Sequence, residues 1–272
     1  MDIFITVLII FLALILLFLF MVAPRMFKRA DRTPFYDRHY AHRGLFDNDS
    51  EAPENSLAAF KKAVDAGYGI ELDVQLSKDN RLVVFHDASL KRMCGVEGKV
   101  WDYTLEELQK MKLANSDETI PTFEQFLEIV DGKVPFILEF KLDRAQTTVC
   151  KLANEVLKDY KGAYCIESFH PLALMWYRKN RPDVLRGQLC EEFFRNPIYK
   201  GQFLYMILPY MPFNFLTRPD FVAYNHEHVT NISRRICKTM GALSVCYTIQ
   251  SVEEYNRAKG HFELMIFDSC IL

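Results

Sequence analysis

Four short segments between residues 40 and 87 decide how this chain is interpreted. They read Tyr40-Ala41-His42-Arg43-Gly44, Ala52-Pro53-Glu54-Asn55-Ser56, Ile70-Glu71-Leu72-Asp73-Val74 and Val83-Val84-Phe85-His86-Asp87. Most of the ionisable side chains stand next to runs of apolar residues, as they do where buried strands end. One acidic pair or one strand-end histidine is usually structural. The convergence of so many such features in one stretch favours a functional site.

Glu71 and Asp73 are two residues apart, so on a strand both side chains point to the same side. Carboxylates this close repel each other, and at least one pKa rises unless a cation lies between them. Oxygen ligands suit hard cations better than zinc. The pair therefore predicts one divalent cation, Ca2+ or Mg2+.

Turn residues follow the acidic pair in Ser77 to Asn80, and the apolar run Leu82 to Phe85 comes next. This pattern predicts a β-hairpin. If the turn centres on Asp79, residue 86 falls opposite residue 72, and His86 lies level with the acidic pair.

The composition excludes some classes of function. The chain has 272 residues, of which 50% are hydrophobic, and a net charge of −2. It can bury a full core, and it has no basic field that would indicate a nucleic-acid partner. The seven cysteines form no Cys-x-x-Cys pair, and an odd, scattered set favours free thiols in a reducing compartment.

The N-terminal residues predict a membrane anchor. Ile3 to Val22 carry no charge and are long enough to span a bilayer of about 30 Å. A cleaved signal peptide is the alternative, but no basic residue precedes the apolar run and no small-residue cleavage site follows it. We expect an anchor over residues 1–24 and a basic juxtamembrane linker over 25–37. Its Arg and Lys residues place the following domain in the cytoplasm, on a single-pass protein of the cell membrane.

Strand and helix patterns alternate over residues 38–272 and predict an α/β fold, a (β/α)8 TIM barrel with a small insertion at about 87–120 after the second strand. The expected strands are 39–44, 70–74, 134–140, 163–168, 184–189, 220–225, 243–248 and 264–268. The expected helices include 56–66, 122–130, 145–159, 171–180, 230–240 and 251–259, with a long connection and helix over 191–216. In such a barrel, catalytic groups lie at the C-terminal ends of strands, as His42, Glu71, Asp73 and Glu139 would.

The quoted segments together resemble the glycerophosphodiester phosphodiesterase family, part of the PI-PLC-like phosphodiesterase superfamily. Further matches are Ile120-Pro121-Thr122-Phe123-Glu124, Leu138-Glu139-Phe140-Lys141 and Glu167-Ser168-Phe169. The resemblance covers about residues 38–268 and is strong up to residue 170. One departure is Tyr247-Thr248, where the family commonly has Trp-Thr.

The resemblance adds roles for several residues. It implies that Glu139 is a third metal ligand beside Glu71 and Asp73, and that Lys141 contacts a phosphate. It places Glu54 and Asn55 at the border of the substrate site. It also implies that the insertion covers the active site, where Trp101 and Met93 would line it.

The resulting hypothesis is metal-dependent hydrolysis of glycerophosphodiesters to sn-glycerol 3-phosphate and an alcohol. The metal, Arg43 and Lys141 would neutralise the phosphoryl oxygens. His42 and His86 fit the general base and the general acid, in either assignment. Attack by water and attack by the neighbouring glycerol hydroxyl both remain open.

Two alternatives stay open. A site held at a bilayer, near the apolar residues 203–216, would suit lysophospholipids, as in a lysophospholipase D. A catalytically inactive, membrane-bound binding module is the alternative of a different class. The run Tyr224 to His228 resembles a second metal site, but one or two of its side chains at the barrel mouth are the simpler interpretation.

Overall fold

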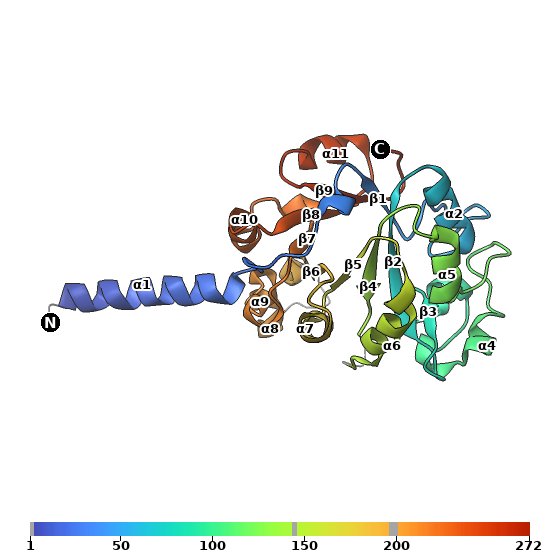
Figure 1. The fold of residues 1–272 in the computed structure, drawn as a ribbon, viewed down its shortest axis with the longest axis horizontal. Helices are drawn as coiled ribbons and strands as arrows, with labels where there is room; N and C mark the ends of the chain where they lie inside the picture. Colours follow the sequence, from blue (N-terminus) through green and yellow to red (C-terminus); the bar gives the residue numbers. More distant parts are fainter. Residues whose placement is uncertain (1–2, 143–145, 196–200) are drawn as a thin grey trace.

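Parallel strands close into a barrel in this computed structural model, which describes residues 3–142, 146–195 and 201–272 (Figure 1). Strand β1 (His39–His42) pairs with β2 (Gly69–Leu76) on one side and with β9 (Leu264–Phe267) on the other, which closes the ring. The other barrel strands are β4 (Phe136–Phe140), β5 (Tyr164–Ser168), β6 (Arg186–Cys190), β7 (Phe221–Asn225) and β8 (Leu243–Ile249). Among the described residues the order is β1-β9-β8-β7-β6-β5-β4-β2, which confirms the predicted TIM barrel.

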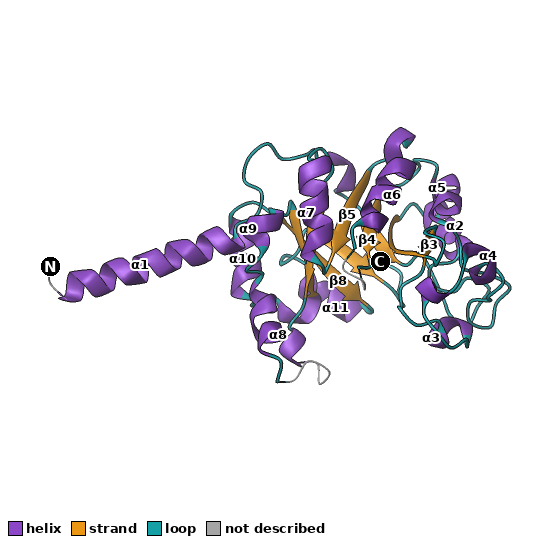
Figure 2. Ribbon diagram, turned by 90° about the horizontal axis from the view of Figure 1, so that it is seen from below, coloured by secondary structure: helices purple, strands orange, loops and turns teal. Residues whose placement is uncertain are grey.

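Helices cover the outside of the barrel (Figure 2). The longer ones are α2 (Leu57–Asp65), α5 (Phe123–Val130), α6 (Thr148–Val156), α7 (Pro171–Asn180), α10 (Ile232–Thr239) and α11 (Val252–Ala258). Their starts follow from local chemistry: the Ser56 hydroxyl accepts the Ala59 N–H, and the Thr122 hydroxyl accepts the Gln125 N–H, both at 3.1 Å. The first residue of the expected helix 145–159 lies outside the described residues.

The hairpin register is confirmed. Strand β3 (Leu82–Val84) runs antiparallel to β2 and stays outside the barrel, with Val74 opposite Val84. The pairing continues for one further residue, because the Phe85 N–H donates to the Asp73 carbonyl at 3.0 Å. His86 therefore follows directly at the level of the acidic pair.

The insertion after β3 folds around a small core of its own. It contains α3 (Lys91–Cys94), a 3-10 turn at Val100–Asp102 and α4 (Leu105–Leu108). Met93 is buried in this core with Phe85, Val100 and Leu108, so its side chain does not line a substrate site as the sequence suggested.

Residues N-terminal to β1 pack against the barrel. Phe35, in a 3-10 turn at Thr33–Phe35, is buried against apolar residues from the barrel interior, and the Tyr40 hydroxyl donates to its carbonyl at 2.9 Å. Before this turn, α1 (Ile3–Val22) projects from the body as an exposed apolar helix that is a candidate membrane span.

The connection between β6 and β7 differs from the expected helix over 191–216. It consists of short pieces: 3-10 turns at Phe193–Arg195 and Leu208–Tyr210, and the helices α8 (Phe203–Ile207) and α9 (Asn214–Thr217). Pro209 and Pro212 explain part of this difference, because proline removes a backbone donor and restricts the residue before it. Residues 196–200 lie outside the described residues.

Candidate active site

Neighbouring strands place the candidate residues level with one another around the barrel. His42 on β1 pairs in register with Glu71 on β2, and Asp73 pairs with Glu139 on β4. Glu139 pairs in turn with Glu167 on β5. Parallel register thus gathers residues that are far apart in the sequence at one end of the barrel. All of them except Asp73 line a cleft of about 330 Å³, whose polar lining includes His42, Arg43, Glu71, His86, Glu139, Lys141, Glu167 and Glu191.

His42 is held by a carboxylate that follows the last strand. Its Nδ1 lies 2.8 Å from Asp268 Oδ2, and its Nε2 lies 3.9 Å from Glu71 Oε2. Asp268 is itself fixed by Gln250 Nε2 and by the Ser269 hydroxyl, each at 2.9 Å. A carboxylate at Nδ1 favours the proton on that nitrogen and leaves the Nε2 lone pair facing the cleft. Burial, and then Arg43, lower the pKa of His42 despite Asp268.

Glu71, Asp73 and Glu139 form the predicted acidic cluster. All three are buried, and one oxygen from each lies within 4.8 Å of the others. Burial, followed by the neighbouring carboxylates, raises the pKa of Glu71 well above its usual value, and burial also raises the pKa of Glu139. Crowded carboxylates of this kind are the donor set that a hard divalent cation relieves.

The pKa of Asp73 shifts in the opposite direction from the pKa values of Glu71 and Glu139. Burial alone would raise its pKa, but Lys141, His86 and Arg43 hold it below its usual range. Its Oδ2 accepts a hydrogen bond from Asn55 Nδ2 at 2.9 Å. Its Oδ1 accepts no hydrogen bond from any described residue, although Lys141 Nζ lies 3.0 Å away. Asp73 Oδ1 thus already faces a cation, the Lys141 ammonium, and three buried carboxylates with oxygens within 4.8 Å of one another form a donor set that suits the expected divalent metal.

Glu167 is a further carboxylate at the site that the sequence marked only within a family motif. It is buried, and its Oε2 has no hydrogen-bond partner among the described residues. Burial, and then Glu139, raise the pKa of Glu167 well above its usual value. It adds to the excess of acidic groups in the cleft.

Lys141 and Arg43 supply positive charge. Lys141 Nζ lies 2.6 Å from Glu139 Oε1. Burial alone would lower the pKa of Lys141, but the negative charges of Asp73 and Glu139 outweigh burial and raise this pKa, so the side chain stays charged. The Arg43 guanidinium pairs with Glu54 at 2.7 Å and lies 3.6 Å from Asp73. The Arg43 backbone has φ +57° and donates to the Glu71 carbonyl at 2.8 Å, so the chain reverses here and aims the side chain into the site.

Glu54 and Asn55 lie behind this layer. Glu54 accepts hydrogen bonds from Arg43 and from Arg92 of the insertion, which, against burial, lower its pKa to about 2. Asn55 holds Asp73, and its N–H donates to the Arg43 carbonyl at 2.9 Å. Both residues position other groups and are not among those that line the cleft.

His86 is oriented from two directions. Its Nδ1 lies 2.6 Å from Asp87 Oδ1, and Arg92 in turn bonds Asp87. Gln75 Nε2 donates to the backbone carbonyls of Phe85, His86 and Asp87 at 2.8, 3.0 and 2.8 Å. Each histidine therefore has a carboxylate oxygen at its Nδ1, at 2.8 Å for His42 and 2.6 Å for His86.

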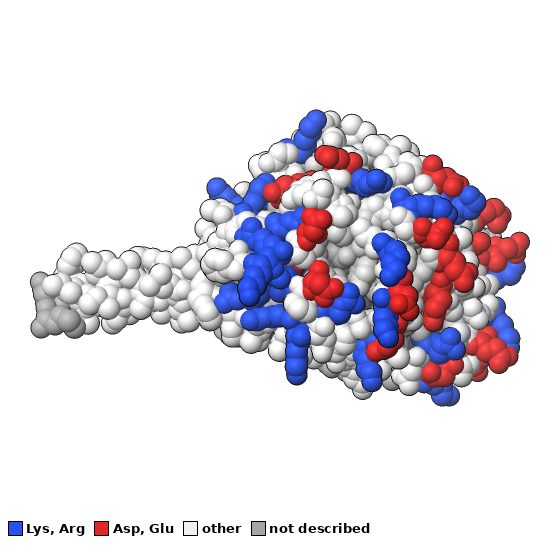
Figure 3. Space-filling model, in the orientation of Figure 1, with Lys and Arg blue, Asp and Glu red and all other residues white. Residues whose placement is uncertain are grey.

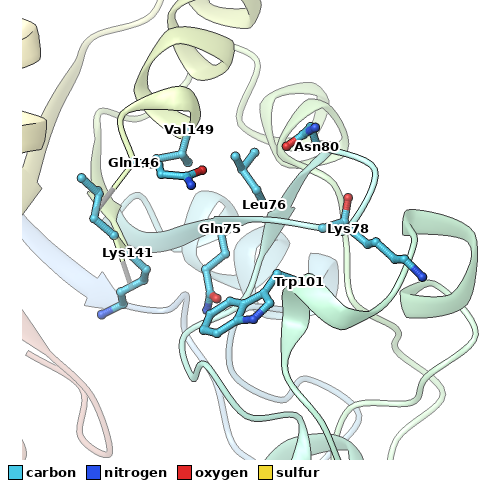
Figure 4. Close-up of a pocket in the computed structure, with 10 residues that line it drawn as sticks. Gln75, Leu76, Lys78, Asn80, Trp101, Lys141, Gln146 and Val149 are labelled. Carbon is cyan, nitrogen blue, oxygen red and sulfur yellow. The ribbon is translucent and has the colours of Figure 1, made fainter. Parts of the chain in front are cut away.

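A smaller pocket adjoins the cleft behind Lys141 (Figure 4). Trp101 from the insertion lines it beside Gln75, and Gln146 lies on the opposite side. Trp101 is not among the residues that line the cleft itself. Lys141 borders both the pocket and the cleft.

Comparison with known proteins agrees with this arrangement. Residues 42–193 match the glycerophosphoryl diester phosphodiesterase family. The chain belongs to this family. It is therefore a phosphoric diester hydrolase by family, as the sequence predicted. A glycerophosphodiester phosphodiesterase from Bacillus altitudinis is 34% identical over 170 residues, which cover 58% of this chain and 68% of that protein.

Other relatives of this phosphodiesterase family are matched over less of their length. A lysophospholipase D from Mus musculus is 31% identical over 151 residues, 51% of this chain and 46% of that protein. The chain thus spans about half to two thirds of the curated relatives named here.

Solved structures agree in fold over most of the chain. The glycerophosphodiester phosphodiesterase from Thermotoga maritima has a TM-score of 0.65 at 25% identity, covering 86% of this chain and 96% of that one. An Oleispira antarctica phosphodiesterase in complex with its product sn-glycerol-3-phosphate has a TM-score of 0.68 at 24% identity, covering 86% and 94%.

Proposed function

We propose that the chain hydrolyses glycerophosphodiesters to sn-glycerol 3-phosphate and an alcohol, with one divalent cation, Ca2+ or Mg2+, held by Glu71, Asp73 and Glu139. The observation that carries this proposal is a pair of histidines in one cleft, His42 and His86, each held at Nδ1 by a carboxylate. The named relatives support the substrate class, and the product bound to the Oleispira antarctica protein supports it further.

In this proposal, different side chains of the site supply charge neutralisation, acid–base catalysis and orientation. When bound, the cation supplies charge neutralisation at the phosphoryl oxygens. Arg43 and Lys141 add fixed positive charge beside the same group, so that charge developing in the transition state meets donors already in place. His42 and His86 provide the base for the nucleophile and the acid for the leaving oxygen. Asp268 and Asp87 hold the two rings in orientation.

Full-length protein in detergent, assayed with glycerophosphocholine and a divalent cation, tests this division of roles. His42→Ala and His86→Ala should each lower kcat by about 10²- to 10⁴-fold, the usual size of an acid–base contribution. His261→Ala is the matched control, because that residue is exposed and outside the cleft. Activity within threefold of wild type in either site variant would remove that histidine from the mechanism.

A lysophospholipase D activity is the second candidate, and an apolar path from the cleft favours it. Tyr247 in the cleft contacts Phe169, which contacts Phe193, which contacts Tyr205 on α8, with ring centroids 6.2, 5.9 and 5.8 Å apart. A further pocket, distinct from the one behind Lys141, lies beside this path and is lined by Phe169, Leu189, Phe193, Leu208, Met211 and Phe213, among others. An acyl chain would follow this path from the phosphate site towards α8.

Comparing kcat/KM for glycerophosphocholine and lysophosphatidylcholine separates the two substrate classes. A preference for the lysolipid that falls at least tenfold in Phe193→Ser, with glycerophosphocholine turnover unchanged, would establish the acyl path. Equal loss on both substrates would mean that Phe193 only supports the fold.

We further propose that α1 crosses the cell membrane once and that the barrel lies in the cytoplasm. The apolar, exposed α1 and the basic residues after it support this orientation. This basic segment is also hydrogen-bonded to the barrel domain. The side chains of Arg25, Arg29 and Arg32 donate to the backbone carbonyls of Pro182, Met240 and Gly241, respectively. Protease protection in sealed vesicles would test the orientation, and a barrel protected inside vesicles with outward-facing cytoplasmic leaflets would contradict it.

A further inference from the structure

The end of α1 is bonded to the barrel without an intervening flexible segment. Val22 is fully buried, and its carbonyl accepts a hydrogen bond from Asn214 Nδ2 at 3.0 Å. Arg218 donates to the carbonyls of Phe20 and Ala23 at 3.1 and 2.8 Å, and its guanidinium lies over the Phe20 ring. Two of the last four carbonyls of α1, those of Phe20 and Val22, thus accept hydrogen bonds from the barrel domain, and a cation stands at the negative end of the helix dipole.

The residues that follow α1 continue this attachment. The Arg25 N–H donates to the Pro219 carbonyl at 2.9 Å, and Arg29 Nη2 donates to the Met240 carbonyl at 2.7 Å. Arg32 donates to the carbonyls of Asp220 and Gly241, each at 2.8 Å. Because these contacts lock α1 to the segments before β7 and β8, a bilayer crossed by α1 would meet a defined side of the barrel.

Helix α8 lies on that side. In Figures 1 and 2, α8, α9 and α10 all lie at the end of the body from which α1 emerges. The exposed fractions of Phe203, Leu204 and Met206 are 74%, 53% and 56%. Phe27 beside the root of α1 and Ile232 on α10 are also exposed, at 78% and 54%. Large apolar side chains are left in solvent beside a helix that is itself apolar enough to cross a membrane.

Positive charge lies near the root of α1, close to Phe27 in the sequence. Lys and Arg side chains gather where α1 meets the body (Figure 3). Lys28, Arg29 and Arg235 in this region are exposed. Exposed apolar side chains with cations nearby are the pattern of surfaces that seat in an anionic leaflet, because the cations attract the negative headgroups.

We propose that Phe27, α8 and the exposed end of α10 form a membrane-contact surface that seats in an anionic leaflet, with Phe203, Leu204 and Met206 in the headgroup–acyl boundary. The inference rests on the proposal that α1 crosses the bilayer. It adds a second contact, which holds the barrel side-on and brings α8, the outer end of the aromatic path, to the lipid.

Tryptophan quenching by brominated lipids tests the contact in full-length protein in nanodiscs that contain anionic lipid. Leu204→Trp and Met206→Trp each place a probe in α8, and Glu106→Trp places a matched probe on the exposed face of α4, far from α1 in Figure 1. After subtraction of the wild-type signal, we expect the α8 probes to lose about half of their fluorescence and the α4 probe to lose almost none, because a seated helix lies about 5–10 Å into the boundary.

Each outcome decides a part of the inference. Unquenched α8 probes in protein that elutes with the nanodisc would overturn the contact while leaving α1 as an anchor, and a second copy covering α8 would give the same result. Protein that does not elute with the nanodisc would overturn both. Equal quenching in purely zwitterionic discs would overturn the anionic preference, which should also weaken in Arg235→Glu.

Discussion

The bond between His42 and Asp268 gives the sharpest mutational prediction. Asp268→Asn keeps the size of the side chain and removes its charge. The amide then donates to His42 Nδ1, so that the ring proton moves to Nε2 and the lone pair no longer faces the cleft. A hydrogen bond to a charged group contributes about 1.5–3 kcal/mol. We therefore expect kcat to fall about 10- to 150-fold, since each 1.36 kcal/mol changes a rate tenfold.

The assay follows sn-glycerol 3-phosphate release from glycerophosphocholine at saturating substrate. KM should change by less than threefold, because Asp268 orients His42 and lies behind it. Ser269→Ala is the matched control: it removes one of the two hydrogen bonds that fix the other oxygen of Asp268 and should cost far less. Full kcat in Asp268→Asn, with an unchanged melting temperature, would refute the claim that the orientation of His42 matters.

Two further predictions concern the metal cluster and the turn beside it. A divalent cation at about 100 times its Kd should stabilise the folded protein by about 2.7 kcal/mol, which raises its Tm by about 5–10 °C. The Glu71→Gln variant should lose this Tm shift. Equal Tm values of the wild-type protein in cation and in EDTA would contradict the metal site. Gly44→Ala should lower Tm more than Gly67→Ala. Both glycines have positive φ, but a Cβ at Gly44 meets Ala59 at 2.9 Å, whereas nothing lies within 4 Å at Gly67. The φ penalty shared by both is about 1–2 kcal/mol, and equal losses by differential scanning fluorimetry would remove the packing argument.

The barrel and the acidic cluster could be predicted because their signals are periodic and local. Strand pattern alone gave all of the barrel strands, and the turn chemistry around Asp79 gave the hairpin register. Glu71 and Asp73 share a side of one strand by spacing alone. Glu139 joins them because parallel register places it opposite Asp73, a relation that the sequence implied only through family resemblance.

The supporting residues could not be found in the same way. Asp268 is 226 positions from His42, and only closure of the barrel between β1 and β9 brings the two together. Arg92 reaches Glu54 and Asp87 from an insertion whose fold has no simple periodicity. Their common signal is an ionisable residue just beyond an apolar strand or on a segment that covers the site, a pattern too frequent to select them from sequence.

The connection between β6 and β7 is a segment whose structure sequence periodicity did not predict. Residues 203–216 are apolar enough for a buried helix, yet Pro209 and Pro212 divide them, and α8 leaves its apolar side chains exposed. Because these residues lack helical spacing, their hydrophobicity predicts an apolar segment but does not predict whether that segment contacts the protein core or its surroundings.

The most direct test of the central claim is the identity of the products. Full-length protein with Ca2+ or Mg2+ is incubated with glycerophosphocholine and followed by phosphorus NMR. The diester resonance should be replaced by that of sn-glycerol 3-phosphate, and chelation should stop the reaction. Release of phosphocholine, or the same turnover after chelation, would contradict the central claim.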